Sequence, residues 1–416
     1  MPGLRRVVPA TIGQEQNLCD LRIESPLCLC DAYERTPRGT VSGPTGGAIQ
    51  ESGGRMRSRV LLACALLLAV FQVADAQTRL VAIVVDFPTS IPTDAQYLQG
   101  VRDDVAAVDQ FNFDQSYGLA PQVTNVVYVG VIDAAPILAT QDYSSGIALI
   151  AYAAQAAAID QGVDLSIYGW GGSIGDGCHC MYFFPQPYEF GATWGVAGVG
   201  NATGMWFGGA FQRTSTPGQR VLAHEEGHHF GIFWEQEGLD CSDQTPLGFT
   251  RGATCVVLRY FDSIDVMGFG NGQFNALAKC YKGWLPCPSP SAFGDYVLEP
   301  FEQFSGTRSI VVDVGSKRLP LPITLEYRQP IGADANLPWV SGANVYNGVI
   351  GHISYSGQSG LTKLLRLHPD DPAYSQKFSA PALKVGETVC FPDSRKGITV
   401  LSASPAGAVV RFGRCR

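Results

Sequence analysis

The sequence predicts an α/β (α+β) domain followed by an all-β, sandwich-like domain. Runs rich in β-branched residues alternate with helical segments up to about residue 290, and short β-type runs divided by turn residues follow. A content of 46% hydrophobic and 16% charged residues is typical of a globular chain. The 48 Gly and 26 Pro residues indicate many turns between short elements.

The first 76 residues are predicted to lie outside the folded chain. MRSRVLLACALLLAVFQVADAQ, which begins at Met56, has a basic start, an apolar run and an A-x-A site, so 56–76 is predicted to be a secretory signal peptide. A membrane anchor is the alternative, but the apolar run is short for a bilayer. Residues 1–55 show no clear periodicity, and we expect Met56 to be the true start. The secreted, extracellular chain would then hold the α/β domain at 77–290 and the sandwich-like domain at 291–416, without a membrane association.

The elements of the α/β domain follow in order. The apolar segment 79–87 predicts a buried first strand. A helix is expected over 93–118, capped by the Thr at its start and stopped by the Gly at its end. VTNVVYVGVI at 123–132 predicts a second strand, and the Ala-rich segment 144–162 predicts a second helix. VDLSIYGW at 163–170 predicts a return to strand.

The sandwich-like domain is predicted from seven short runs that follow the linker PCPSPSAFGD. Their spacing is typical of antiparallel strands. The runs are YVLEPF, RSIVVDVG, LPITLEYRQ, GVIGHISYS, ETVCF, ITVLSAS and AVVRFG.

The segment TSTPGQRVLAHEEGHHFG predicts a helix with matched ends. Thr216 can cap it, Pro217 suits its first turn, and Gly231 can end it in a left-handed conformation. Glu226 points away from the face that carries the first histidine of the motif, and we expect its carboxylate to be solvated.

This helix carries the spacing of a zinc site. His224 and His228 lie ~40° apart around it, one turn from each other, and two imidazoles in that relation can chelate one zinc ion. Glu225 lies beside them, where it can take a proton from a zinc-activated water and pass it to a leaving amine. His229 could pair with Glu225, and a second register would use these two as ligands. The alternative to a zinc site is an ordinary helix that carries histidines by chance.

The segment HEEGHHFGIFW, followed by DSIDVMGFG, resembles the metzincin metalloproteases, in which a Met-turn forms the floor below the metal. Met267 would be that Met. WGVAGVGNATGMWFGG, DVMGFGNGQFNALAKCYKGWL and VGETVCFPDSRKGITVLSASPAGAVVRF are similar to segments of the gametolysin family of metzincins. The resemblance covers most of 79–413 and implies a metzincin-like catalytic domain. It also implies a zinc-dependent endopeptidase that cleaves Pro-rich glycoproteins of the extracellular matrix or cell wall.

The resemblance departs at Trp234, which stands where the family has its third histidine ligand. An indole N–H is only a donor and cannot bind a cation. Glu235 is the nearest substitute, because zinc proteases also use two His and one Glu, and Glu237 and Asp240 follow on the same segment. If these acids are only solvated, the chain is a catalytically inactive protein that binds matrix or cell-wall glycoproteins. Phe269 stands where some metzincins carry a Tyr that stabilises the oxyanion.

Charge and cysteine content bound the remaining possibilities. A net charge of −8 argues against a nucleic-acid partner. Of the 12 cysteines, those after residue 77 are even in number, which predicts disulfides in an exported chain but leaves their pairing open. A structural zinc–cysteine site is disfavoured because paired C-x-x-C spacings are lacking. These cysteines are Cys178, Cys180, Cys241, Cys255, Cys280, Cys287, Cys390 and Cys415.

Four further residues are assigned from their local sequence. Asn201 begins an N-x-T sequon and is a predicted glycosylation site. His179 lies between two cysteines expected to form disulfides, and His352 and His368 lie in segments that predict structural roles.

Overall fold

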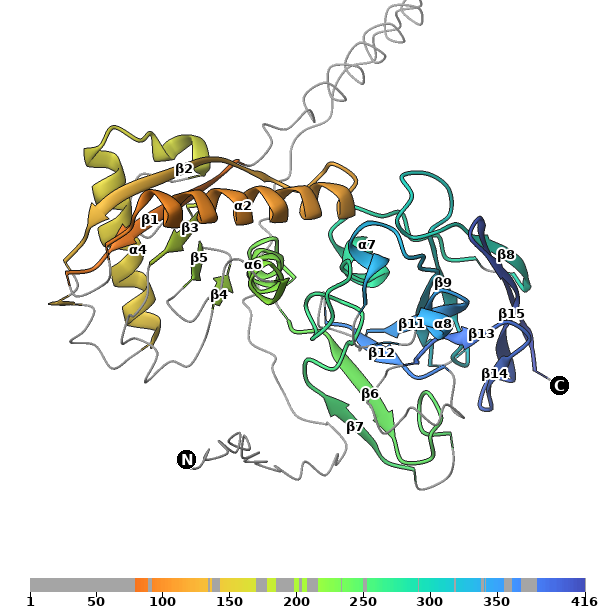
Figure 1. Cartoon of the computed structure of the whole chain (residues 1–416). Helices are drawn as coiled ribbons and strands as arrows, with labels where there is room; N and C mark the ends of the chain where they lie inside the picture. The colour runs from red at the N-terminus through yellow and green to blue at the C-terminus, as the bar shows by residue number, and fades with distance from the viewer. Residues whose placement is uncertain are drawn as a thin grey trace, which may run out of the picture. The chain divides into compact units, whose positions relative to one another are not determined.

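The described N-terminal part of the chain forms a five-stranded sheet with helices on both faces (Figure 1). In the computed structural model its strands are ordered β2-β1-β3-β5-β4. β1 (Arg79–Asp86) pairs in parallel with β2 (Gln122–Val131) and with β3 (Cys180–Phe183). β5 (Gly204–Phe207) extends the parallel sheet beside β3, and β4 (Gly198–Asn201) closes the edge in antiparallel orientation.

The described residues all belong to one of the two units into which the chain divides, Leu68–Arg416. The predicted signal peptide and upstream segment lie outside them, so both remain predictions. The structure describes 79–88, 92–133, 135–136, 143–169, 178–184, 198–201, 204–207, 216–232, 234–249, 253–290, 292–317, 319–337, 340, 342–354, 361–367 and 380–415.

Both faces of β1 are buried, because helices cover the sheet on each side. Its even-numbered residues from 80 to 84 join a core with α2 (Ala95–Gln115) and α6 (Thr216–His229). The odd-numbered residues from 81 to 85 pack instead with α4 (Tyr143–Asp160). Because alternate side chains of a strand point to opposite faces, a strand buried on both sides must be apolar throughout. The unbroken run of β1 fits this rule, and the predicted first strand is confirmed.

The cap of α2 differs from the predicted one. Asp94 caps the helix, with its side chain accepting a hydrogen bond of 2.6 Å from the Tyr97 N–H. Thr93 is drawn toward the end of β1, where its hydroxyl donates to Asp86 at 2.7 Å. A carboxylate is at least as good a cap as a hydroxyl, so the helix begins one residue later than a Thr93 cap would place it.

The segment predicted as a third strand begins with a turn of helix instead. Leu165–Tyr168 forms a 3-10 helix, η1, and the Asp164 side chain accepts from the Ser166 N–H at 3.0 Å. Such a local side-chain bond competes with strand pairing, which accounts for the wrong prediction. The next strand of the sheet is β3, which begins only at Cys180.

A seven-stranded sheet follows, in the order β7-β6-β12-β11-β10-β9, with β13 also paired to β11. Two of its strands precede residue 290, and β6 pairs in parallel with β12. The sheet therefore spans the predicted domain boundary. Its strands are β6 (Glu237–Cys241), β7 (Cys255–Leu258), β9 (Ser309–Asp313), β10 (Pro322–Glu326), β11 (Gly348–Ile353), β12 (Lys363–Leu365) and β13 (Leu383–Lys384).

A four-stranded antiparallel sheet, ordered β14-β15-β16-β8, shares a hydrophobic core with the seven-stranded sheet. Leu325, Phe391 and Val410 are among the buried side chains of this core. The prediction of an α/β part followed by a β-rich part is thus confirmed. The remaining elements are β8 (Gly294–Leu298), β14 (Thr388–Phe391), β15 (Lys396–Ser404), β16 (Gly407–Arg414), α7 (Ala276–Tyr281), η2 (Gly332–Ala335) and α8 (Gly342–Val345).

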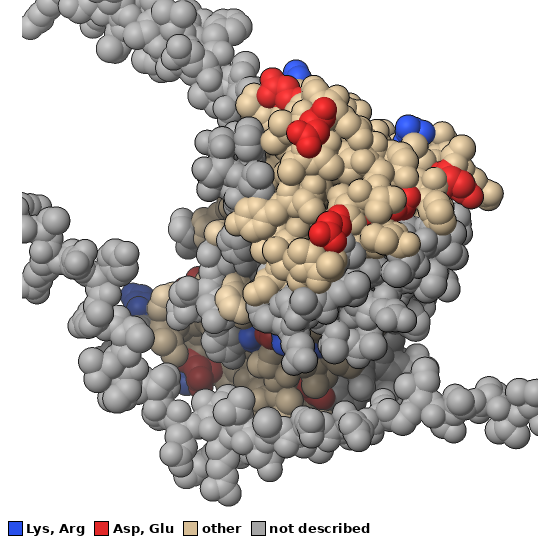
Figure 2. Space-filling view, turned by 90° about the vertical axis from the view of Figure 1, so that its left-hand side faces the viewer, with Lys and Arg blue, Asp and Glu red and all other residues tan. Residues whose placement is uncertain are grey.

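The disulfide prediction is confirmed, since all eight of the named cysteines pair. The pairs are Cys178–Cys180, Cys241–Cys255, Cys280–Cys287 and Cys390–Cys415. Among the helices of the described residues, none has the length and apolarity needed to cross a membrane. On the face shown in Figure 2, acidic side chains are spread over the described surface together with several Lys and Arg side chains.

Candidate functional site

α6 carries the motif residues and ends as its sequence predicts. Gly231 adopts φ 91°, the left-handed conformation that stops a helix. Its N–H donates to the carbonyl of His228 at 3.0 Å, and the N–H of Ile232 donates to that of Gly227 at 2.9 Å. The side chain of Leu222 anchors the helix in the core below the five-stranded sheet's parallel strands. The helix is thus fixed both at its end and along its buried face.

Backbone carbonyl groups orient both motif histidines. Nδ1 of His224 lies 2.9 Å from the carbonyl oxygen of Val266, and Nδ1 of His228 lies 2.9 Å from that of Ile232. A carbonyl can only accept, so each Nδ1 carries the proton and each Nε2 keeps a lone pair. The two rings lie 4.9 Å apart between centroids, at 86° to each other. A carbonyl bonded to one nitrogen is the usual partner of an imidazole that binds metal through the other.

The same two histidines are held neutral. Burial, and then the charge of His228, lowers the pKa of His224 to about 4. Burial also lowers the pKa of His228. Metal binding requires the deprotonated imidazole, so neither ring has to lose a proton at neutral pH before it can act as a ligand.

Glu225 directly follows His224 on α6, and Met267 follows Val266, whose carbonyl accepts from His224. Glu225 is only 8% exposed. Burial, the hydrogen bond to Glu235 and, to a smaller extent, the charge of Glu225 raise the pKa of the Tyr260 phenol to about 12. Met267 is buried, its N–H donates to Asp265 Oδ1 at 2.7 Å, and its sulfur packs against the Cα of Gly227. The residues predicted as ligands, base and floor therefore lie in one place.

The predicted third ligand is engaged elsewhere. Oε1 of Glu235 accepts from Nη2 of Arg259 at 3.0 Å and from the hydroxyl of Tyr260 at 2.7 Å. The ring of Tyr260 stacks on that of His224 with centroids 6.1 Å apart, so Glu235 lies near the histidines without joining them. Trp234 is 44% exposed. In the described part of the chain, no three His, Cys, Asp or Glu side chains are grouped as a metal site.

The other acids of the segment have partners of their own or lie apart. Glu237 forms an ion pair of 2.7 Å with Lys363, and Asp240 follows it on β6. Phe269 packs edge-on against Phe261 at 5.4 Å. Tyr260, which the sequence does not single out, supplies a phenol near His224 instead. Its distance along the chain from the helix gives no local signal for that approach.

One expectation for the back of α6, a solvated Glu226, is corrected. Glu226 is 1% exposed rather than solvated, and its Oε2 accepts from the side-chain amide of Asn112 on α2. Burial, reinforced by the charge of Asp109, raises its pKa well above the usual value. Nε2 of His229 lies 2.6 Å from Nδ1 of His179. Because α6 is buried on several sides, a side chain that points away from the histidines meets protein and not water.

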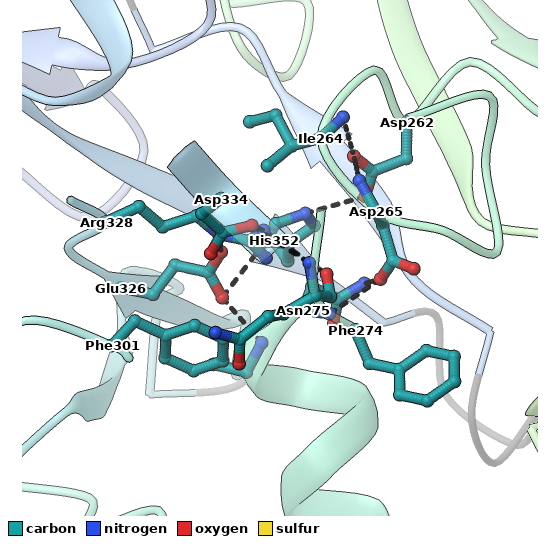
Figure 3. Close-up of polar contacts among 12 residues, drawn as sticks. Asp262, Ile264, Asp265, Phe274, Asn275, Phe301, Glu326, Arg328, Asp334 and His352 are labelled. Atoms are coloured by element: carbon teal, nitrogen blue, oxygen red, sulfur yellow. Dashed lines mark hydrogen bonds and ion pairs between the residues drawn. The ribbon is translucent and has the colours of Figure 1, made fainter. Parts of the chain in front are cut away.

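A buried polar network fixes the segment that carries Met267 (Figure 3). Nε2 of His352 on β11 lies 2.9 Å from Asp262, and Asp265 accepts from both nitrogen donors of Asn275 at 2.6 and 2.7 Å. Although burial alone would raise it, the charge and hydrogen bond of His352 hold the pKa of Asp262 below its usual range. The structural role predicted for His352 is a tie between this segment and the seven-stranded sheet.

Arg328 anchors the second half of the network and is fully buried (Figure 3). It donates to Glu326 at 2.7 Å and to Asp334 at 3.1 Å. Asp334 also accepts from the N–H of Gln273 at 2.9 Å, and Glu326 accepts from that of Ala276 at 2.5 Å. The network therefore continues from the sheet to Gln273 and Ala276, which follow the segment that carries Met267.

The remaining predictions lie at or beyond the limits of the described residues. The backbone of Asn201 ends β4, but its side chain and the rest of the sequon are outside them, as is His368. No protein-family model matches the chain, and no curated protein matches it.

Proposed function

We propose that the chain is a secreted zinc-dependent endopeptidase related to the gametolysin family, with matrix or cell-wall glycoproteins as substrates. One observation carries the proposal. His224 and His228 are neutral and lie one turn apart on α6. Nδ1 of each donates a hydrogen bond to a backbone carbonyl, so the lone pair of each Nε2 is available to bind a metal ion.

Each residue of the site has a distinct part in peptide hydrolysis. Bound zinc would supply Lewis-acid polarisation of the scissile carbonyl. Glu225 would take the proton of the attacking water and return it to the leaving amine. Its near-complete burial favours this role, because bulk water is kept away from the proton that it transfers. Met267 supports the helix from below through its contact with Gly227.

The residues present fit two of the three protein ligands of a catalytic zinc site. Glu235 is the third ligand in this proposal, which requires its carboxylate to leave Arg259 and Tyr260. The Arg259 side chain is 68% exposed, and an ion pair of that kind contributes only about 0–1 kcal/mol. The ion pair with Arg259 therefore opposes the binding of Glu235 to a divalent cation by only a small free energy.

A second candidate function is an inactive protein that binds the same glycoproteins. It is favoured by the engagement of Glu235 together with the exposed Trp234 at the position of the third ligand. In this case the chain would fold and persist without stoichiometric metal.

Metal content and proteolysis of the purified secreted chain separate the two functions. We expect about one zinc per chain by elemental mass spectrometry, and loss of zinc and of cleavage together on treatment with a chelator. Glu225→Gln should keep zinc and reduce kcat by about 100-fold or more, because it removes the general base. Glu226→Gln is the matched control, since Glu226 faces Asn112 and lies outside the catalytic machinery. A folded, metal-free and inert wild type would refute the enzyme, and full activity of Glu225→Gln would refute the base.

A further inference from the structure

An arginine that forms no ion pair with any described carboxylate lies one helical turn before His224. The Nε of Arg220 on α6 is buried and has no hydrogen-bond partner. Among the described residues no carboxylate forms an ion pair with this guanidinium. Burial lowers its pKa. A buried donor without a hydrogen-bond partner is costly, so an acceptor placed at this Nε would stabilise the protein.

Arg220 lines a cavity of about 240 Å³ between α2 and α6. Val108 and Phe111 of α2 give it an apolar wall, and Asn271 and Asn336 are its uncharged polar lining residues. None of its described lining residues is acidic. At ~30 Å³ for each water, this volume holds on the order of eight waters, which is the size of one amino-acid side chain.

The cavity adjoins the histidine pair. Val266 lines it, and the carbonyl of the same residue accepts the hydrogen bond from His224. The charge of Arg220 contributes to the low pKa of His224, as expected for residues four apart on a helix. A ligand in the cavity would therefore lie beside the site where peptide cleavage is proposed.

We propose that this cavity is a carboxylate-binding subsite, in which Arg220 holds an Asp or Glu side chain of the peptide that is cleaved. The guanidinium matches a carboxylate with two parallel hydrogen bonds, and the apolar wall accommodates the methylene groups of the side chain. The peptide as the source of the carboxylate rests on the proposed function, whereas recognition of a carboxylate by Arg220 does not. A free small carboxylate has the same chemistry and is the other source.

The test measures binding to Glu225→Gln protein, in which cleavage does not interfere. The probes are short Pro-rich peptides, acetylated and amidated, with one Glu at successive positions, each paired with a twin that has Gln there. Fluorescence anisotropy should show at least one Glu peptide binding about tenfold or more tightly than its twin. Adding Arg220→Gln should abolish the difference and Arg220→Lys should reduce it. Arg102→Gln is the matched control, because Arg102 is exposed on α2 and its loss removes the same charge.

The outcomes separate the subsite from the enzyme. Glutarate is titrated as a free carboxylate. If glutarate binds through Arg220 but no Glu peptide does, the result would support a carboxylate site whose ligand is a free small molecule. Binding of a Glu peptide that depends on Arg220, without cleavage by the wild type, would support the subsite and refute the endopeptidase. Equal binding of Glu and Gln peptides, with no effect of Arg220→Gln on either probe, would overturn the subsite even if the wild type cleaves proteins. Thermal unfolding of each variant confirms that it is folded.

Discussion

Gly227 allows α6 to lie directly on the turn below it, and Gly227→Ala should destabilise the protein. A Cβ at this position would overlap the sulfur of Met267 and lie 2.9 Å from Cε1 and 3.1 Å from Cζ of Phe274. Alanine favours the helix by about 1 kcal/mol, but overpacking of a close-packed core costs about 1–3 kcal/mol. The difference between these two effects is a net loss of up to about 2 kcal/mol.

Gly100 on α2 provides the matched control, because a Cβ there meets nothing within 4 Å. Urea unfolding should show Gly100→Ala stabilised by up to about 1 kcal/mol and Gly227→Ala destabilised, with equal m-values. In a Met267→Ala background the cost of Gly227→Ala should shrink, since the nearest obstacle is gone. If Gly227→Ala is as stable as Gly100→Ala, then the close approach of helix and turn is wrong.

Two further predictions concern the flanks of the site. Burial raises the pKa of Asp109 from 3.8 to about 7, so the stability it contributes is present below pH 3.8 and lost as the pH rises to about 7. Asp109→Asn can still accept from the Val123 N–H, and it should remove this loss of unfolding free energy when urea unfolding is measured from pH 4 to 8. An unchanged pH profile would contradict the raised pKa of Asp109. Glu235→Ala should weaken zinc binding sharply in a competition titration, whereas Glu237→Ala, whose native carboxylate pairs with Lys363, should not. Equal zinc affinity of Glu235→Ala and wild type would exclude Glu235 as a ligand.

Local pattern was sufficient for most elements of the fold. The Ala-rich helix, the apolar first strand and the seven β-type runs all form, because each depends on periodicity or composition within about ten neighbouring residues. The C-terminal end of α6 was also predictable, since Gly231 terminates it by its own backbone preference. The errors at the start of α2 and at η1 both arise where an Asp side chain offers the backbone a competing hydrogen bond.

Contacts between distant parts of the chain were not predictable in this way. The position of Glu226 around the axis of α6 predicts a side chain that faces outward. In the structure, Asn112 on α2 covers this side chain and donates a hydrogen bond to it. Tyr260 approaches His224 because β6 and β7 form a hairpin that returns the chain toward α6, and no spacing within either segment encodes that return. The parallel pairing of β6 with β12 similarly joins segments on both sides of the expected boundary at 290.

Long-range hydrogen bonds also connect the segments of the candidate site to the seven-stranded sheet. The segment that carries Met267 is held by His352 through Asp262, and Asn275 at its end donates to Thr362 at 2.7 Å. Thr362 in turn donates through its N–H to Gln236 at 2.8 Å, just past Glu235. The floor under α6 and the segment of the proposed third ligand are therefore both tied to strands of the seven-stranded sheet. A site formed by the α/β part alone would need none of these buried bonds, so the β-rich part contributes to the framework of the candidate site.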